Sequence, residues 1–228
     1  MSLPPRAQIR AVLLDLDGTL VDTAPDIAAA ANAMLGALGR TTLPESRIAG
    51  FIGQGIATLV RRALAATGGE DDEARFAGAL ASFEAAYLEH VADRSRPYPG
   101  VVTGLERLRA ARVPLACVTN KASRFTLPLL ASTGLRGYFG VVVSGDDVAR
   151  KKPEPDALLA ASGALGVTPG ESWVIGDSRN DVRAARAAGC PVAVVPYGYR
   201  EGLAVEALGA DAIVASVEAA AGWITMGA

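Results

Sequence analysis

The chain has 228 residues, of which 50% are hydrophobic, and its formal net charge is -2. This hydrophobic fraction excludes a disordered chain and is enough for the core of one large domain, or of a domain that carries an insertion. No basic block indicates a nucleic-acid partner, and no apolar run is long enough to span a membrane. We therefore expect a cytoplasmic protein, and the sequence leaves a monomer and a homodimer equally open.

Cysteine and histidine contribute little chemistry to this sequence. Cys117 and Cys190 lie in or beside apolar, strand-like segments, and two scattered cysteines form neither a disulfide framework nor a metal knuckle. We expect both to be small buried hydrophobic residues. His90 is the one histidine, so carboxylates have to carry out any proton transfer.

The first predicted element is a strand, Arg10–Asp15, which leads into Asp17, Gly18 and Thr19. Alternate residues of a strand point to the same face, so Asp15 and Asp17 face the same way. Two such acids repel each other unless a cation lies between them or one holds a proton. Gly18 lets the backbone turn and approach a ligand closely. These features predict a metal-assisted phosphate site.

A helical insertion follows the first strand. Almost 100 residues separate the first strand from the second, which is too long for one crossover helix. The segment contains no strand-like run, and we expect four helices, at about Pro25–Leu38, Pro44–Phe51, Ile56–Ala66 and Asp71–Val91. Residues 22–94 are therefore predicted to form a helical cap domain, inserted into a core made of residues 1–21 and 95–228.

Beyond the insertion, apolar strands alternate with helices, which indicates an α/β fold. The strands are apolar throughout, as expected for a parallel sheet covered on both faces. We predict a Rossmann-like, doubly wound parallel sheet with further strands at Pro114–Thr119, Tyr138–Ser144, Ser172–Asp177, Pro191–Val195 and Asp211–Val214. The intervening helices are predicted at about Val102–Ala111, Arg124–Thr133, Pro155–Leu165 and Asn180–Ala188.

Ligands of parallel α/β sheets bind at the carboxyl ends of the strands. Polar residues follow the predicted strands at these ends: Thr119, Asn120 and Lys121, then Lys151 and Lys152, then Asp177 and Asp181. Only three of the 22 basic residues are lysines, and all three lie just beyond strands. An ammonium group is a compact charge that arginine cannot copy. Together with Asp15 and Asp17, this set suits a hard divalent cation on oxygen ligands, with Mg²⁺ as the best match.

These segments, in this order and spacing, resemble the four motifs of the haloacid dehalogenase-like hydrolase superfamily, and the insertion resembles the cap of that family. The resemblance covers essentially the whole chain. Asp177–Asp181, Val118–Lys121, Gly53–Gly55 and Pro196–Tyr199 resemble in particular the phosphoglycolate phosphatase branch.

The resemblance implies catalytic roles for four residues. Asp15 is expected to attack phosphorus and form an aspartyl-phosphate, and Asp17 to protonate the leaving alcohol and then deprotonate water. Thr119 is expected to hydrogen-bond the phosphoryl group. Lys152, which precedes Pro153, is expected to steady Asp15, with Lys151 as the alternative.

The resemblance also implies the ligands of Mg²⁺ and the contacts to substrate. Asp15, the main-chain carbonyl of Asp17, and Asp177 are expected to bind the metal, and Asp181 to bind it or to orient its waters. The expected substrate contacts are Gly18, Gln54, Asn120 and Lys121. Arg61 and Arg62 are interpreted as the solvated face of a helix, with a substrate carboxylate as the alternative.

The favoured function is therefore a phosphatase for a small phosphorylated metabolite, with 2-phosphoglycolate as the favoured substrate. The alternatives are a sugar phosphomutase, a phosphatase for sugar phosphates or pyrophosphate, and a non-catalytic binding module. The related mutases often carry a histidine where this chain has Ile27. Related dehalogenases lack the second acid, which is present here as Asp17, and phosphonate hydrolysis needs a cap lysine, which residues 22–94 lack.

Overall fold

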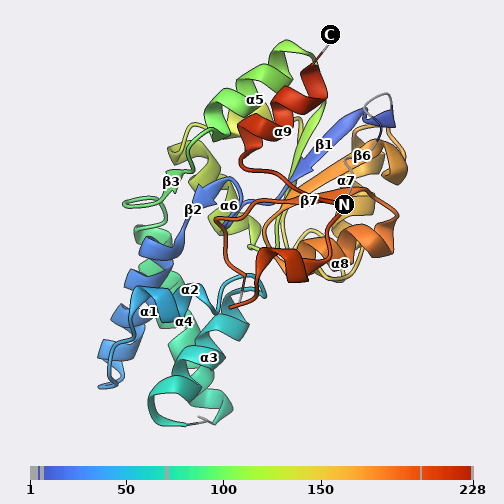
Figure 1. Cartoon of the computed structure of the whole chain (residues 1–228). Coiled ribbons are helices and arrows are strands. Elements are labelled where there is room, and N and C mark those ends of the chain that lie inside the picture. Colours follow the sequence, from blue (N-terminus) through green and yellow to red (C-terminus); the bar gives the residue numbers. More distant parts are fainter. Residues whose placement is uncertain (1–4, 6–7, 70–71, 201, 227–228) are drawn as a thin grey trace.

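A parallel six-stranded sheet forms the centre of the molecule (Figure 1). The computed structural model describes residues 5, 8–69, 72–200 and 202–226. Across the sheet the strands are β5 (Val141–Val143), β4 (Leu115–Val118), β1 (Ala11–Leu14), β6 (Ser172–Gly176), β7 (Val192–Val194) and β8 (Ala212–Ile213). Because β1 lies between β4 and β6, the loops that follow these three strands meet.

Helices cover both faces of this sheet, and the side chains of β1 alternate between them. Val12 and Leu14 pack in one hydrophobic cluster with α5 (Val101–Ala110), α6 (Ser123–Ser132) and α9 (Val217–Thr225). On the opposite face, Leu13 packs with α7 (Asp156–Ala164) and α8 (Arg179–Ala188). The predicted doubly wound α/β fold is confirmed. Cys117 and Cys190 are buried free thiols, as expected.

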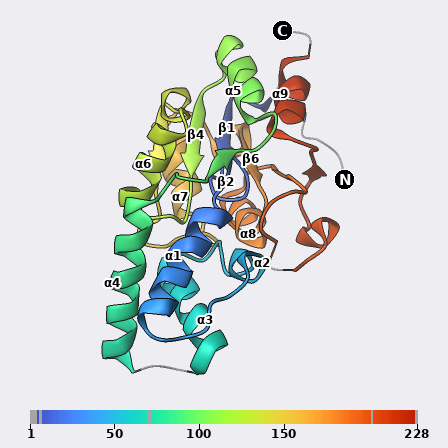
Figure 2. The ribbon, with the colours of Figure 1, turned by 90° about the vertical axis from the view of Figure 1, so that its left-hand side faces the viewer.

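The inserted segment is helical and gathers on one side of the sheet (Figures 1 and 2). Within the described residues it contains α1 (Ala24–Ala37), α2 (Glu45–Ala49), α3 (Ile56–Gly68) and α4 (Glu73–Glu89). α1 packs against α2 and α4, and α3 packs against α4. Asp71, where the fourth helix was expected to begin, lies outside the described residues. In the part of the chain that the structure describes, no helix is both long and apolar enough to cross a membrane.

The two chain segments that connect the insertion to the sheet lie side by side, and the sequence did not predict this pairing. β2 (Val21–Asp22) pairs with β3 (Arg96–Pro97) in antiparallel fashion. The buried Asp26 carboxylate, in the first turn of α1, accepts hydrogen bonds from the backbone N–H of Arg94 and of Ser95 and from Ser95 Oγ, at 2.6–3.0 Å. Asp22 lies in β2, two residues before α1 begins.

Two elements near the sheet edges also differ from the prediction. β5 is shorter than expected, because residues 136–138 form a 3₁₀ turn in which Tyr138 hydrogen-bonds Glu106. α9 was not predicted from its local sequence pattern. Tertiary packing supports α9 instead: Gly104 of α5 is so close that an added Cβ would lie 2.8 Å from the backbone of Val217 and Glu218.

We predict opposite stability effects for two helical Gly→Ala substitutions. Gly104→Ala forces α5 and α9 apart and should lower the free energy of unfolding by about 1–3 kcal/mol. Gly78→Ala in α4, where an added Cβ meets nothing within 4 Å, should raise it by about 0.5–1 kcal/mol. Denaturant unfolding of both variants measures this difference. Equal effects of the two substitutions would contradict the close α5–α9 contact.

Candidate active site

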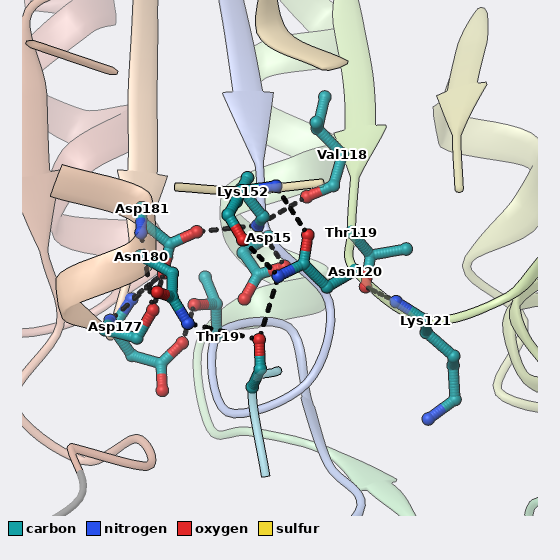
Figure 3. A network of polar contacts seen from close by, with 12 residues as sticks. Asp15, Thr19, Val118, Thr119, Asn120, Lys121, Lys152, Asp177, Asn180 and Asp181 are labelled. Carbon is teal, nitrogen blue, oxygen red and sulfur yellow. Dashed lines mark hydrogen bonds and ion pairs between the residues drawn. The ribbon is translucent and has the colours of Figure 1, made fainter. Parts of the chain in front are cut away.

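Side chains from the carboxyl ends of β1, β4 and β6 meet in one pocket (Figure 3). The loop between α2 and α3 contributes Ile52 and Gly53 from the inserted segment. The other lining residues are Asp15, Asp17, Thr119, Asn120, Lys152, Asp177, Ser178, Asn180 and Tyr199. The fold therefore brings the predicted residues together at the carboxyl ends of the strands, as the sequence rule predicted.

The Lys152 ammonium group lies at the centre of the charged cluster. Its Nζ donates to Asp15 Oδ1 at 2.7 Å, to Asp181 Oδ1 at 2.6 Å and to the main-chain carbonyl of Val118 at 2.9 Å. Burial disfavours the charge, but the carboxylates of Asp15 and Asp181 outweigh burial and raise the pKa of Lys152. Lys151 is exposed, so Lys152 is the lysine that the structure places beside Asp15.

Three carboxylates share this buried space. Oxygen atoms of Asp15, Asp177 and Asp181 lie within 4.8 Å of one another. Burial, followed by the charge of Asp181, raises the pKa of Asp15 to about 7 against the opposing effect of Lys152. Burial and the charges of Asp15 and Asp181 also raise the pKa of Asp177 well above its usual value. One ammonium group therefore does not balance these three acids.

Asp181 is the acid of this cluster that is held most firmly in its ionised form. Its Oδ1 accepts from Lys152, and its Oδ2 accepts from Ser178 Oγ at 2.6 Å and from Ser178 N at 3.0 Å. Burial opposes ionisation, but the ion pair with Lys152 and the bonds from Ser178 lower the pKa of Asp181. The bond from Ser178 N, together with a bond from Asp181 N to Ser178 Oγ at 3.4 Å, forms a capping box at the start of α8. Asp181 thus orients Lys152 and the turn that carries Asp177.

This donor set fits a hard divalent cation. Carboxylate oxygens are the ligands that Mg²⁺ prefers, and a bound cation would favour the ionised forms of Asp15 and Asp177 against the burial and the mutual repulsion that raise their pKa values. Asp15 and Asp177 are best placed to bind it, with Asp181 beside them. The Asp17 carboxylate is not part of this group, and the expected contact through its main-chain carbonyl stays a prediction.

Asp17 has different surroundings from Asp15, although only two residues separate them. Its Oδ1 accepts from Thr23 Oγ1 at 2.7 Å and from Lys121 Nζ at 2.8 Å. Lys121 is buried, and its ammonium lies 4.8 Å from the ring centroid of Tyr87 in α4. Burial opposes the charge, but Asp17 and Tyr87 together raise the pKa of Lys121. Asp17 thus lies at the junction between the sheet and the inserted helices.

A second hollow adjoins the pocket at Asp17. Its apolar lining comes mainly from Ile27, Ile52, Ile56 and Leu59, and its charged lining residues are Asp17 and Lys121. Asp17, Ile52, Gly53 and Asn120 line both spaces. A ligand whose reacting group lies at Asp15 can therefore extend past Asp17 towards Lys121.

The other predicted substrate contacts have structural partners or lie outside the pocket lining. Asn120 Nδ2 donates to the carbonyls of Gly53 and Lys152, and its Oδ1 accepts from Lys152 N. Gly18 N donates to the carbonyl of Val21. Gln54 is exposed and is not a lining residue of either space. Their contacts with substrate stay predictions.

Comparison with known proteins agrees with this geometry. A family model described as haloacid dehalogenase-like hydrolase matches residues 9–189. The chain belongs to the haloacid dehalogenase-like hydrolase family. A phosphoglycolate phosphatase of Thiobacillus denitrificans is 50% identical over 220 residues, which cover 95% of this chain and 96% of the relative. The prediction of a hydrolase related to the phosphoglycolate phosphatases is confirmed.

Solved structures that resemble this chain have the same fold. The crystal structure of a predicted phosphoglycolate phosphatase from Haemophilus somnus has a TM-score of 0.89 at 32% identity, and the match covers 92% of this chain and 96% of that one. A β-phosphoglucomutase structure from Thermotoga maritima has a TM-score of 0.73 at 27% identity, with 96% and 100% covered.

Sequence reasoning assigned no role in the site to Tyr199 or Asn180, and it noted Thr19 only as part of the motif after the first strand. Thr19 Oγ1 donates to Asp177 Oδ1 at 2.7 Å, and Tyr199 N donates to Asp177 Oδ2 at 2.6 Å. Asn180 Nδ2 donates to the Gly53 carbonyl at 3.2 Å. Tyr199 follows β7, so the rule that ligands bind at strand ends, applied to this strand as well, would have found it.

The arginine pair of α3 does not line the pocket or the adjoining hollow. Arg61 pairs with Glu73 at 3.2 Å and lies over the ring of Phe76 at 3.6 Å from its centroid. Arg62 lines a separate open hollow with Arg47 on the outside of the inserted segment. This placement agrees with the interpretation of a solvated helix face.

We predict that Mg²⁺ stabilises the protein more at about pH 8 than at about pH 5. The raised pKa of Asp15 means that the native state holds a proton that the unfolded state has lost. Without metal, stability should therefore fall as the pH rises from about 4 to about 7. Mg²⁺ competes with that proton and should restore about 2.7 kcal/mol at 100 times its Kd once the acids are ionised.

Thermal unfolding with and without MgCl2, at matched ionic strength, measures this effect. Asp177→Asn is the control, because it removes one carboxylate from the cluster and should abolish most of the Mg²⁺-dependent rise in Tm. An equal rise in the variant would rule out this cluster as the metal site.

Proposed function

We propose that this chain is a Mg²⁺-dependent phosphatase that hydrolyses a small phosphomonoester, with 2-phosphoglycolate as the favoured substrate. The observation that carries the proposal is the pairing of Asp15 with Lys152 beside Asp177 and Asp181, while Asp17 faces the adjoining hollow. The name of the 50% identical relative supports the choice of substrate.

In the first half-reaction, an Asp15 carboxylate oxygen attacks phosphorus as the bond to the leaving oxygen breaks. Asp17 gives its proton to that oxygen, and an aspartyl-phosphate remains on Asp15. Lys152 holds Asp15 in position, and Thr119, buried in the pocket lining, hydrogen-bonds the phosphoryl oxygens. Mg²⁺, held by Asp15 and Asp177, would supply positive charge against the phosphoryl oxygens.

In the second half-reaction, water attacks the phosphorus of the aspartyl-phosphate. Asp17, now ionised, takes a proton from this water, and the bond between phosphorus and Asp15 breaks. Inorganic phosphate leaves, and both aspartates return to their starting states. One group can serve as acid and then as base because the leaving oxygen and the water occupy the same side of phosphorus in turn.

We further propose that residues 22–94 act as a cap domain over a core made of residues 1–21 and 95–228. The Gly53 carbonyl accepts hydrogen bonds from Asn120 and Asn180 of the core, and this contact holds the cap loop over the pocket. A cytoplasmic location, and a monomer or homodimer, stay part of this proposal.

The adjoining hollow favours a leaving group that is small and anionic. Lys121 is its cationic lining residue, and Ile27, Ile56 and Leu59 offer no hydrogen-bond partners for sugar hydroxyls. Polar groups that lose water without gaining a partner reduce affinity strongly. A carboxylate on the leaving alcohol, paired with Lys121, fits these walls better than a sugar.

We predict that Asp15→Asn lowers kcat by about 10⁴-fold or more, because an amide is a very poor nucleophile towards phosphorus. Release of phosphate from a phosphomonoester measures this loss, and Asp93→Asn at an exposed site should retain the wild-type rate. Activity of Asp15→Asn close to that of the wild type would exclude Asp15 as the nucleophile. Wild-type activity that persists after chelation of Mg²⁺ would exclude the metal.

We predict that Lys121→Met lowers kcat/KM for 2-phosphoglycolate by roughly 10- to 100-fold, the value of a hydrogen bond between charged groups. For ethyl phosphate, which lacks the second anion, the loss should be clearly smaller. Steady-state kinetics with both substrates measure this difference. Lys151→Met is the matched control, because it removes an exposed ammonium group and should leave both values close to those of the wild type.

A panel of phosphomonoesters tests the choice of substrate itself. If 2-phosphoglycolate ranks below sugar phosphates or pyrophosphate in kcat/KM, the proposed substrate is wrong, and the compound class that ranks first takes its place.

A further inference from the structure

The Tyr199 side chain connects the loop after β7 to the start of the first inserted helix. Its hydroxyl oxygen accepts hydrogen bonds from the backbone N–H groups of Thr23 and Ala24, both at 2.8 Å, and donates to Asp22 Oδ1 at 2.5 Å. Its own backbone N–H donates to Asp177 Oδ2 at 2.6 Å. One residue thus contacts both the acidic cluster and the outgoing connection to the insertion.

The start of α1 lacks the usual cap. Thr23 is the N-cap residue, and such a threonine normally accepts a hydrogen bond from a backbone N–H of the first turn. The side chain of Thr23 makes no such bond. Its hydroxyl donates to Asp17 instead, at 2.7 Å. Pro25 has no N–H to satisfy, so the Tyr199 oxygen takes up the two N–H groups that precede it.

The position of the Thr23 hydroxyl depends on the backbone that carries it. The Tyr199 oxygen holds the backbone N–H groups on both sides of the Thr23 Cα, and from this backbone Thr23 Oγ1 reaches Asp17 Oδ1. Without the Tyr199 hydroxyl, the helix start carries buried, unpaired N–H groups, which are costly. The backbone at Thr23 would then shift until these N–H groups reach another acceptor, and the Thr23 hydroxyl would move with it. Asp17 would then lose one of the two groups that orient its Oδ1.

The surroundings of Tyr199 keep this arrangement in place. Burial raises the pKa of Tyr199, so its hydroxyl stays protonated and can donate to Asp22. Its ring lies so close to Gly18 that a Cβ added there would be 2.9 Å from Tyr199 Cδ2. The ring therefore packs against the same turn that carries Asp17.

We propose that Tyr199 is a positioning residue for Asp17: its hydroxyl caps the start of α1 by binding the backbone N–H groups of Thr23 and Ala24, and so holds the Thr23 hydroxyl on the Asp17 carboxylate. The consequence for catalysis rests on the proposed function, in which Asp17 protonates the leaving oxygen. The capping itself does not rest on that function and can be measured without substrate.

Tyr199→Phe tests the capping through amide hydrogen exchange. The variant keeps the ring and the backbone bond to Asp177 but removes the oxygen, so the amides of Thr23 and Ala24 should exchange at least tenfold faster. Tyr197→Phe is the matched control, because it removes a hydroxyl two residues away that donates to the Thr19 carbonyl. Unchanged exchange at Thr23 and Ala24 in Tyr199→Phe would overturn the capping.

The dependence of the rate on the leaving group tests the link to Asp17. An alkyl phosphate needs a proton on its leaving oxygen, whereas p-nitrophenyl phosphate has a leaving group that departs without one. Tyr199→Phe should lower kcat for the alkyl phosphate by roughly 10- to 100-fold, the effect of a small misplacement of a catalytic group. For p-nitrophenyl phosphate kcat should change by less than about threefold.

Thr23→Val and its combination with Tyr199→Phe complete the test. Both single variants should show the same dependence on the leaving group, and the double variant should be no worse than the poorer single one, since both act through one path. Equal losses for both substrates, or additive losses in the double variant, would overturn the positioning role. A wild-type enzyme inactive on both phosphates would contradict the proposed function, while the exchange data would still decide the capping.

Discussion

A single buried ammonium group, that of Lys152, keeps the acids of this site together. It donates to Asp15 and Asp181, while Asp177 lies within the same group of oxygens. Removal of one partner from a buried ion pair typically costs several kcal/mol, because the remaining charge has lost its compensation. The ammonium is in place because Asn120 bonds both the backbone N–H and the carbonyl of Lys152. One ammonium group does not balance three carboxylates, so the rest of the site is arranged around Lys152 and around room for a second positive charge.

The groups that hold Lys152 also hold the inserted segment. Asn120 Nδ2 is shared between the carbonyls of Lys152 and Gly53, and Asn180 donates to Gly53 from the start of α8. The loop of the insertion is therefore fastened to the two strand ends that position the lysine and the acids. Movement of that loop away from the pocket breaks bonds to residues of the charged cluster. These shared hydrogen bonds therefore couple access to the pocket to the positions of its charged side chains.

The strands, the helices and the meeting of the acids could be predicted because each leaves a local pattern. Apolar runs mark the strands, and polar residues at their ends mark the site. The β2–β3 pair could not be predicted, since strands of two residues show no periodicity. The contacts of Asp26 and of the Tyr199 hydroxyl could not be predicted either, since their partners lie 68 to 177 residues away in the chain. Tertiary structure alone brings these groups together.

Asp15 and Asp17 show what the sequence pattern leaves out. The alternation of side chains along a strand makes the two acids equivalent, but their surroundings differ. Burial and the charges of Asp181 and Lys152 govern the ionisation of Asp15. Thr23 and Lys121 instead hold the Asp17 carboxylate at the base of the insertion. The charged groups that act on Asp15, namely Asp181, Lys152 and Asp17, all belong to segments that directly follow sheet strands, with Asp181 in the first turn of α8. Thr23 instead precedes α1, and Lys121 lies over Tyr87 of α4. The sheet alone can therefore prepare the attacking carboxylate, while the orientation of the second acid depends on how the inserted helices are seated.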